Sequence, residues 1–357
     1  MIAVRAPAAA AFFVFFLLLA QLPRQAAAGS GIKLPPPAEG AYHSAHPYFG
    51  PYDDAVDADE IDSFVALSGK KIVWSYVSFN WFGGVNFPAE ACRILHGKGI
   101  VPLVGIMPWS APEQGRAERV YTLERILRGD FDADLRRSAK EAASLGFPIM
   151  MEFGPEANGS WFPWSGAWNG RSEDRYGERG KPDGPERFRD AYRRVADIFR
   201  AGGAIDVTWV FHISSNGSPK EAWNYASNYY PGDDWVDWIG VSVYGRLRGD
   251  EPAEPFDRIM KRVYPGLCAL SPTRPIALLE LGVSDSPKAG DKAAWIAEAL
   301  GSVTGARYPR IRAVSWWNKK LRPDGSPSTL EIDSSAEALA AYRDGARSLV
   351  DEPHWGE

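Results

Sequence analysis

The chain has 357 residues, a mild net charge of −5 and no basic stripe, which argues against nucleic acid as a partner. Its 14 tryptophans are a large number, and many stand beside polar residues instead of inside apolar runs. Because flat aromatic faces stack on apolar surfaces such as the faces of sugar rings, this pattern favours a carbohydrate ligand.

The first residues have the pattern of an export signal. Arg5 precedes a short apolar run, residues 11–20, and the small residues around Ala28 offer a cleavage site. The run is about ten residues long, whereas a helix needs roughly 20 to span a bilayer. We therefore predict a signal peptide over residues 1–28 and a secreted or periplasmic protein, without stable membrane insertion after cleavage. An uncleaved membrane anchor is the alternative.

Residues 29–42 include three consecutive prolines and predict a linker or irregular lead-in. After it, apolar runs of strand length alternate with amphipathic helical patterns. Strands are expected at 42–50, 71–79, 100–109, 147–153, 206–214, 236–244, 275–282 and 311–318. Helices are expected at 57–69, 87–99, 132–146, 186–203, 256–270, 292–303 and 335–350.

Near-continuous apolar strands between amphipathic helices are typical of a parallel sheet covered on both faces. The eight strand–helix units predict an α/β fold, a single (β/α)8 TIM barrel over residues 43–357, although the helix after the fifth strand (218–230) is poorly defined. An open doubly wound sheet is the alternative, but no glycine-rich phosphate loop follows the first strand. Cys92 and Cys268 would lie on opposite sides of a barrel, which predicts two free, largely buried thiols.

Two glutamates stand where a barrel carries its chemistry, at the carboxyl ends of strands. Glu156 follows the fourth expected strand and Glu280 closes the seventh, so the two would face each other across the barrel mouth. Two carboxylates about 5–5.5 Å apart are what retaining glycoside hydrolysis requires. We predict that Glu156, among aromatic rings, is a protonated acid. Glu280 should stay ionised, held by a donor such as Tyr244, which could equally be a packed rim residue.

Other side chains near these strand ends are candidates for binding a sugar. The tryptophans expected as stacking platforms, each of which could instead belong to the core, are Trp161, Trp164, Trp316 or Trp317, and Trp109. Asn158 would either bind a sugar hydroxyl or cap the turn at Gly159, and His212 would either line the cleft or be structural. No HExxH, paired CxxC or dense His/Asp cluster is present, so we expect neither a metal nor a cofactor.

The segment "GPEANGSWFPWSG" (154–166) resembles the acid/base motif of glycoside hydrolase family 26, which contains mannanases and related β-glycan endohydrolases in clan A. The resemblance continues in order through 128–153, 186–214, 229–245, 276–282 and 315–318. The family is a retaining one, so the resemblance implies Glu156 as acid/base and Glu280 as nucleophile.

Two positions depart from the family pattern. Members commonly have histidine directly before the acid/base glutamate and arginine at the position of Glu152, whereas this chain has Pro155 and Glu152. Both departures bear on mannan specificity more than on glycosidase chemistry. Glu152 either lies beside Glu156, where like charge would raise one pKa, or faces away from the barrel axis.

We therefore expect a monomeric retaining endo-β-glycosidase that hydrolyses a mannan-like polysaccharide, a β-glucan or a xylan by double displacement. A non-catalytic carbohydrate-binding protein on a hydrolase scaffold is one alternative, motivated by Pro155 and Glu152. A transglycosylase that remodels exopolysaccharide with the same residues is another.

Overall fold

The structure is a computed structural model that describes residues 31–285, 291–320 and 327–355, so the expected signal peptide lies outside the described residues. Within them, eight parallel strands form one sheet in the order β1-β8-β7-β6-β5-β4-β3-β2. The strands are β1 (Tyr42–His46), β2 (Trp74–Asn80), β3 (Val101–Met107), β4 (Ile149–Phe153), β5 (Val207–Ser214), β6 (Trp238–Tyr244), β7 (Ile276–Gly282) and β8 (Ile311–Trp317).

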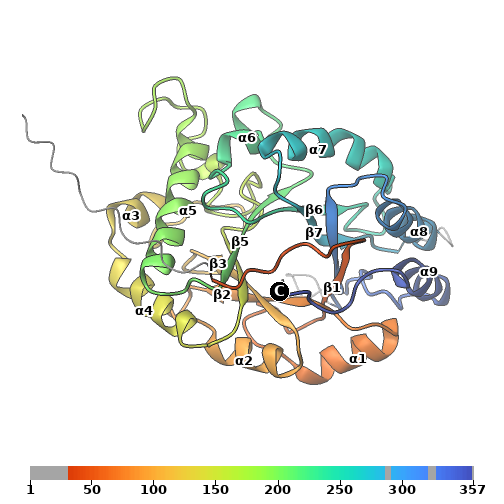
Figure 1. The fold of residues 1–357 in the computed structure, drawn as a ribbon. Helices are drawn as coiled ribbons and strands as arrows, with labels where there is room; N and C mark the ends of the chain where they lie inside the picture. Colours follow the sequence, from red (N-terminus) through yellow and green to blue (C-terminus); the bar gives the residue numbers. More distant parts are fainter. Residues whose placement is uncertain (1–30, 286–290, 321–326, 356–357) are drawn as a thin grey trace, which may run out of the picture. The chain divides into compact units, whose positions relative to one another are not determined.

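The two ends of this strand order meet, which makes the sheet a nearly closed barrel (Figure 1). At the seam the Val73 N–H donates to the His43 carbonyl at 2.9 Å. The prediction of a (β/α)8 barrel is confirmed, and each expected strand is present, although β1 ends four residues earlier than expected.

Helices surround the strands (Figure 1). They are α1 (Ala58–Ser68), α2 (Ala89–Gly97), α3 (Leu123–Arg128), α4 (Asp132–Ala143), α5 (Asp183–Ala201), α6 (Ala226–Tyr229), α7 (Phe256–Leu270), α8 (Asp291–Thr304) and α9 (Ala336–Ala346), with short 3-10 turns at Gly166–Trp168 and Ala222–Asn224. The segment after β5 forms only the second of these turns and α6, and α3 was not expected. No helix in the described ranges is long and apolar enough to cross a bilayer.

Strand residues alternate between the barrel interior and the layer that packs on the helices. On β4, Met150 belongs to the interior cluster, whereas Ile149, Met151 and Phe153 pack outward. This two-residue period places Glu152 on the inward face with Met150. The alternative that Glu152 faces away from the barrel axis is therefore wrong.

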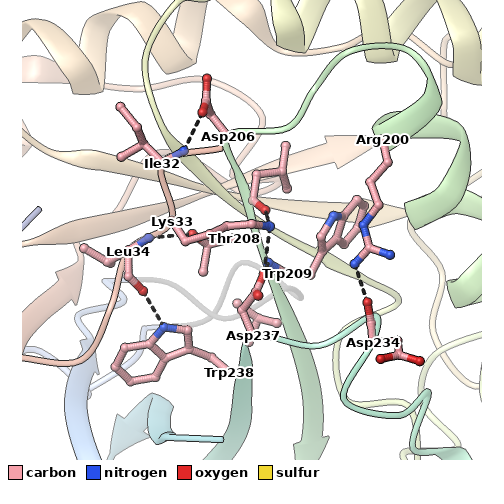
Figure 2. Close-up of polar contacts among 12 residues, drawn as sticks. Ile32, Lys33, Leu34, Arg200, Asp206, Thr208, Trp209, Asp234, Asp237 and Trp238 are labelled. Carbon is pink, nitrogen blue, oxygen red and sulfur yellow. Dashed lines mark hydrogen bonds and ion pairs between the residues drawn. The ribbon is translucent and has the colours of Figure 1, made fainter. Parts of the chain in front are cut away.

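The lead-in before β1 is irregular but tightly bound at the amino-terminal ends of β5 and β6 (Figure 2). Leu34 is 1% exposed and belongs to the interior cluster. Its N–H donates to Thr208 Oγ1 at 2.8 Å, and its carbonyl accepts from Trp238 Nε1 at 2.9 Å. Lys33 forms an ion pair with Asp237 at 3.0 Å. This segment thus covers the base of the barrel and does not behave as a linker.

Both cysteines are free, as predicted. Cys92 on α2 is buried, and burial raises the pKa of its thiol to about 12, whereas Cys268 on α7 is half-buried.

Candidate active site

The turn after β4 carries Glu156 in an unusual backbone conformation. Glu156 has a φ of 51°, in the left-handed region that residues with a side chain seldom adopt. The turn is tied to β3, because the Gly154 N–H donates to the Ile106 carbonyl at 2.9 Å. Trp161 Nε1 donates to Glu156 Oε2 at 2.6 Å, and the carboxyl is largely buried. A strained, fixed carboxyl at a strand end is the kind of feature that marks a functional site.

Glu280 reaches the same mouth of the barrel from β7. The pairing of β6 with β7 shifts by one residue, from Val241 opposite Leu278 to Ser242 opposite Glu280. Such an irregularity re-aims a side chain at a barrel rim. The Tyr244 hydroxyl donates to Glu280 Oε2 at 2.7 Å, as the sequence predicted.

The charge state of Glu280 differs from the expectation that it stays ionised. Burial and the nearby charge of Glu156 raise the pKa of Glu280 to about 8, and the opposing effects of His212 and the Tyr244 hydrogen bond do not cancel this rise. Near neutral pH a large share of Glu280 is therefore protonated, and its ionised form grows as the pH rises through about 8.

A buried charge pair lies beneath these carboxyls. Glu152 and His212 are 1% and 3% exposed, and His212 Nδ1 lies 2.9 Å from Glu152 Oε2. His212 Nε2 lies 2.8 Å from Ser242 Oγ. Burial lowers the pKa of His212, but the charge and hydrogen bond of Glu152, with smaller contributions from Glu280 and Glu156, together outweigh burial and raise the pKa to about 9. His212 is therefore a cation at neutral pH, and its ring nitrogens are occupied by protein groups.

Two of the expected sugar platforms are packing residues. Trp164 and Trp316 are each 1% exposed, so no sugar can reach their faces. Trp164 stacks on Phe162, with ring centroids 4.5 Å apart. Trp316 points outward from β8 onto Tyr342 of α9 at 5.5 Å. The expectation of a binding role for these two tryptophans is wrong.

Trp161 and Trp317 remain available. Trp161 is half-buried and holds Glu156 by its ring nitrogen, so it lies directly beside the candidate acid. Trp317 is half-buried on the inward side of β8, against the ring of His46 with centroids 4.3 Å apart. Lys319 Nζ lies 5.5 Å from the Trp317 ring centroid.

Asn158 is structural instead of sugar-binding. Its side-chain oxygen accepts from the Ser214 N–H at 2.8 Å, and its Nδ2 donates to the Ser214 carbonyl at 2.9 Å. Both ends of the buried amide are thus used to fix the turn after β4 to the end of β5.

Beside the site lies a row of aromatic side chains, of which the sequence pointed only to Trp109. It contains Tyr52 and Phe82, from the segments after β1 and β2. The available signal was an aromatic residue shortly after each of several consecutive strands. Among the residues that the structure describes, no group of three or more His, Cys, Asp or Glu side chains could hold a metal ion.

Residues 124–274 match the family model of glycosyl hydrolase family 26. This match covers less than half of the chain, and over that segment the chain is similar to the family. The matched segment includes Glu152, Glu156, His212 and Tyr244 and ends before Glu280. The resemblance read from the sequence is therefore confirmed at the level of the family.

The curated relatives are named for activities on different polysaccharides. Endoglucanase H of Acetivibrio thermocellus is 28% identical over 287 residues, which cover 80% of this chain and 28% of the relative. A beta-1,3-xylanase of an Alcaligenes species is 24% identical over 168 residues, which cover 46% of this chain and 31% of the relative. The chain thus spans about a third or less of the length of these two proteins.

Solved structures of family 26 enzymes share the fold. The catalytic domain of the endo-beta-1,4-mannanase of Bacillus sp. JAMB-750 superposes with a TM-score of 0.63 at 14% identity, covering 89% of both chains. A Cellulomonas fimi endo-beta-1,4-mannanase double mutant superposes with a TM-score of 0.60 at 17% identity, covering 87% of this chain and 71% of that one. At these identities the likeness extends to the barrel alone.

Proposed function

We propose that the protein is a retaining endo-β-glycosidase, with Glu156 as acid/base and Glu280 as nucleophile. The observation that carries this proposal is the pair of carboxyls at the ends of β4 and β7, each held by one aromatic donor, Trp161 or Tyr244. The match of residues 124–274 to the family 26 model supports the same reaction class.

Double displacement would use the pair in two steps. In the first, Glu156 gives its proton to the glycosidic oxygen while the Glu280 carboxylate attacks the anomeric carbon and forms a glycosyl ester. In the second, the Glu156 carboxylate takes a proton from water, the water attacks the anomeric carbon, and the bond to Glu280 breaks. The first step therefore needs a protonated Glu156 and an ionised Glu280.

Positive charge and hydrogen bonding at Glu280 favour its ionised form. Tyr244 donates to Glu280, and His212 as a cation lowers the pKa of Glu280. Both effects stabilise the carboxylate at Glu280 and so oppose the rise in its pKa that burial causes. Because the ring of His212 is bound by Glu152 and Ser242, it would act through its charge and not by contact with the sugar.

The substrate class is a β-linked polysaccharide, in keeping with relatives named as an endoglucanase, a beta-1,3-xylanase and endo-beta-1,4-mannanases. Pro155 offers no donor, and Glu152 is bound to His212, so neither position presents a cation to a sugar. We infer that other side chains set the preference for one polymer. We also propose a monomer exported by the signal in residues 1–28.

The test is sugar release from β-mannan, β-glucan, β-1,3-xylan and β-1,4-xylan. Glu280→Ala and Glu156→Ala should each lose several orders of magnitude of activity on the polymer that the wild type hydrolyses. Glu90→Ala, on the exposed face of α2, is the matched control and should keep full activity.

Rescue by azide distinguishes the nucleophile Glu280 from the acid/base Glu156. With Glu280→Ala azide should restore activity and give a glycosyl azide of inverted configuration, whereas with Glu156→Ala it should give the retained configuration. Binding of a polymer by the wild type without sugar release would instead support a non-catalytic binding protein. Products longer than the substrate would support a transglycosylase.

A further inference from the structure

We propose that Tyr52 and Phe82 form a sugar-binding platform that extends the active site across the segments after β1 and β2, for sugars remote from the cleaved bond. This inference rests on the proposed function, because the platform would hold further units of the same neutral β-linked glycan chain.

The rings form a continuous row that ends in the loop of Glu156. Tyr52 and Phe82 have centroids 5.7 Å apart, and Phe82 and Trp109 have centroids 5.3 Å apart. Trp109 then contacts Phe162 at 5.8 Å and Trp164 at 5.5 Å. These residues follow four neighbouring strands, β1 to β4, so the row runs along the barrel rim.

Exposure increases along the row away from the catalytic pair. Trp109 is buried, Phe82 is half-buried and Tyr52 is 47% exposed. A cluster that served only to close the core would bury its outer ring as well. An aromatic face that is held in place but left open to solvent is what a stacking platform requires.

Asn80 at the end of β2 fixes the row from below. Its Oδ1 accepts from Trp109 Nε1 at 2.7 Å, and its Nδ2 donates to the Tyr52 carbonyl at 2.9 Å. The inner ring and the outer segment are thus held by one side chain. Such preorganisation reduces the ordering cost of binding.

The charges next to the platform favour a neutral glycan. Asp53, the residue after Tyr52, is buried and bound by His46 at 2.9 Å and by Lys319. The Lys319 ammonium is therefore compensated by a carboxylate and is not presented to an acidic sugar. Stacking, which any neutral sugar face can make, remains as the main contact.

Remote binding of this kind should appear as a dependence on chain length. Sugars on the platform would add binding energy only for substrates long enough to reach it. Tyr52→Ala should therefore lower kcat/KM about tenfold for long oligosaccharides and polymer, and leave kcat/KM unchanged for the shortest substrate that is cleaved. Tyr52→Phe keeps the ring and should behave like the wild type.

The experiment measures kcat/KM for the wild type, Tyr52→Ala, Tyr52→Phe and Phe82→Ala on an oligosaccharide ladder prepared from the polymer that the enzyme hydrolyses. Trp355→Ala removes an exposed ring near the carboxyl terminus and serves as a control. An equal loss on short and long substrates, or no loss on the longest one, would overturn the platform.

Failure of the proposed function gives a different result. If the wild type releases no sugar, polymer binding is measured by affinity electrophoresis, and weaker binding by Tyr52→Ala would support the platform without catalysis. If the wild type neither hydrolyses nor binds these polymers, both the platform and the proposed function are wrong.

Discussion

Replacing Glu152 by glutamine tests the buried charge pair beneath the candidate catalytic carboxyls. The change keeps the shape of the side chain and removes the negative charge 2.9 Å from His212. Burial lowers the pKa of His212, and the variant removes the main carboxylate that opposes burial, so the charged fraction of the histidine at physiological pH should fall. The wild type should then owe part of its stability to the protonated pair.

The size of that contribution follows from the pKa of His212. It is raised from the ordinary value of 6.5 to about 9 in the folded protein. This difference corresponds to about 3 kcal/mol in the free energy of unfolding. Because the folded pKa lies above the unfolded one, the stabilisation is fully present below about pH 6.5 and is lost as the pH rises through about 9.

Urea unfolding followed by tryptophan fluorescence measures the effect. The stability difference between the wild type and Glu152→Gln should be larger at about pH 6 than at about pH 10, by about 3 kcal/mol. Taking this difference cancels the titrating groups that Glu152 does not influence. Glu90→Gln on exposed α2 should show no such change. A difference for Glu152→Gln that stays constant over the same pH range would show that His212 is not charged by Glu152.

Two further variants test the base of the barrel and the nucleophile. Leu34→Ala should lower the free energy of unfolding, measured by urea titration, by about 2–5 kcal/mol, because Leu34 fills the barrel base. The control Ile32→Ala changes a side chain that is 56% exposed and should lower the free energy of unfolding by less than about 0.5 kcal/mol. Tyr244→Phe removes a hydrogen bond that lowers the pKa of Glu280, so the acid limb of the kcat/KM profile should move to higher pH. Tyr192→Phe, which removes a buried hydroxyl elsewhere, should leave that profile in place.

The order of strands and helices could be predicted because each element has its own local pattern. On α5, Phe188, Tyr192, Val195 and Phe199 recur at helical spacing, and all four are buried. The positions of Glu156 and Glu280 at strand ends followed from the same pattern, since parallel strands of a barrel place their carboxyl ends at one mouth.

The direction of individual side chains was harder to predict, because both faces of these strands are buried. On β4, Ile149, Met150 and Met151 are all apolar, so no alternation reveals which face Glu152 shares. Adjacent Trp316 and Trp317 on β8 present the same ambiguity. The structure resolves it, since only Trp317 lies on the inward side.

Features that depend on contacts between distant segments could not be predicted at all. The burial of Leu34 inside the barrel depends on hydrogen bonds of its backbone with Thr208 and Trp238, which are far away in the sequence. The raised pKa of Glu280 likewise depends on its proximity to Glu156 and on burial, while the sequence suggested only the donor Tyr244.

The charges at the barrel mouth explain how the site can tolerate glutamate where the family resemblance leads us to expect arginine. An unpaired Glu152 would add a third negative charge near Glu156 and Glu280 and would raise the pKa of Glu280 further. His212 supplies the missing positive charge from the next strand and offsets Glu152 at 2.9 Å. This offset limits the negative charge that acts on Glu280, whose ionised form the proposed attack requires. The departure at Glu152 is thus compatible with the proposed chemistry only because β5 places His212 beside it.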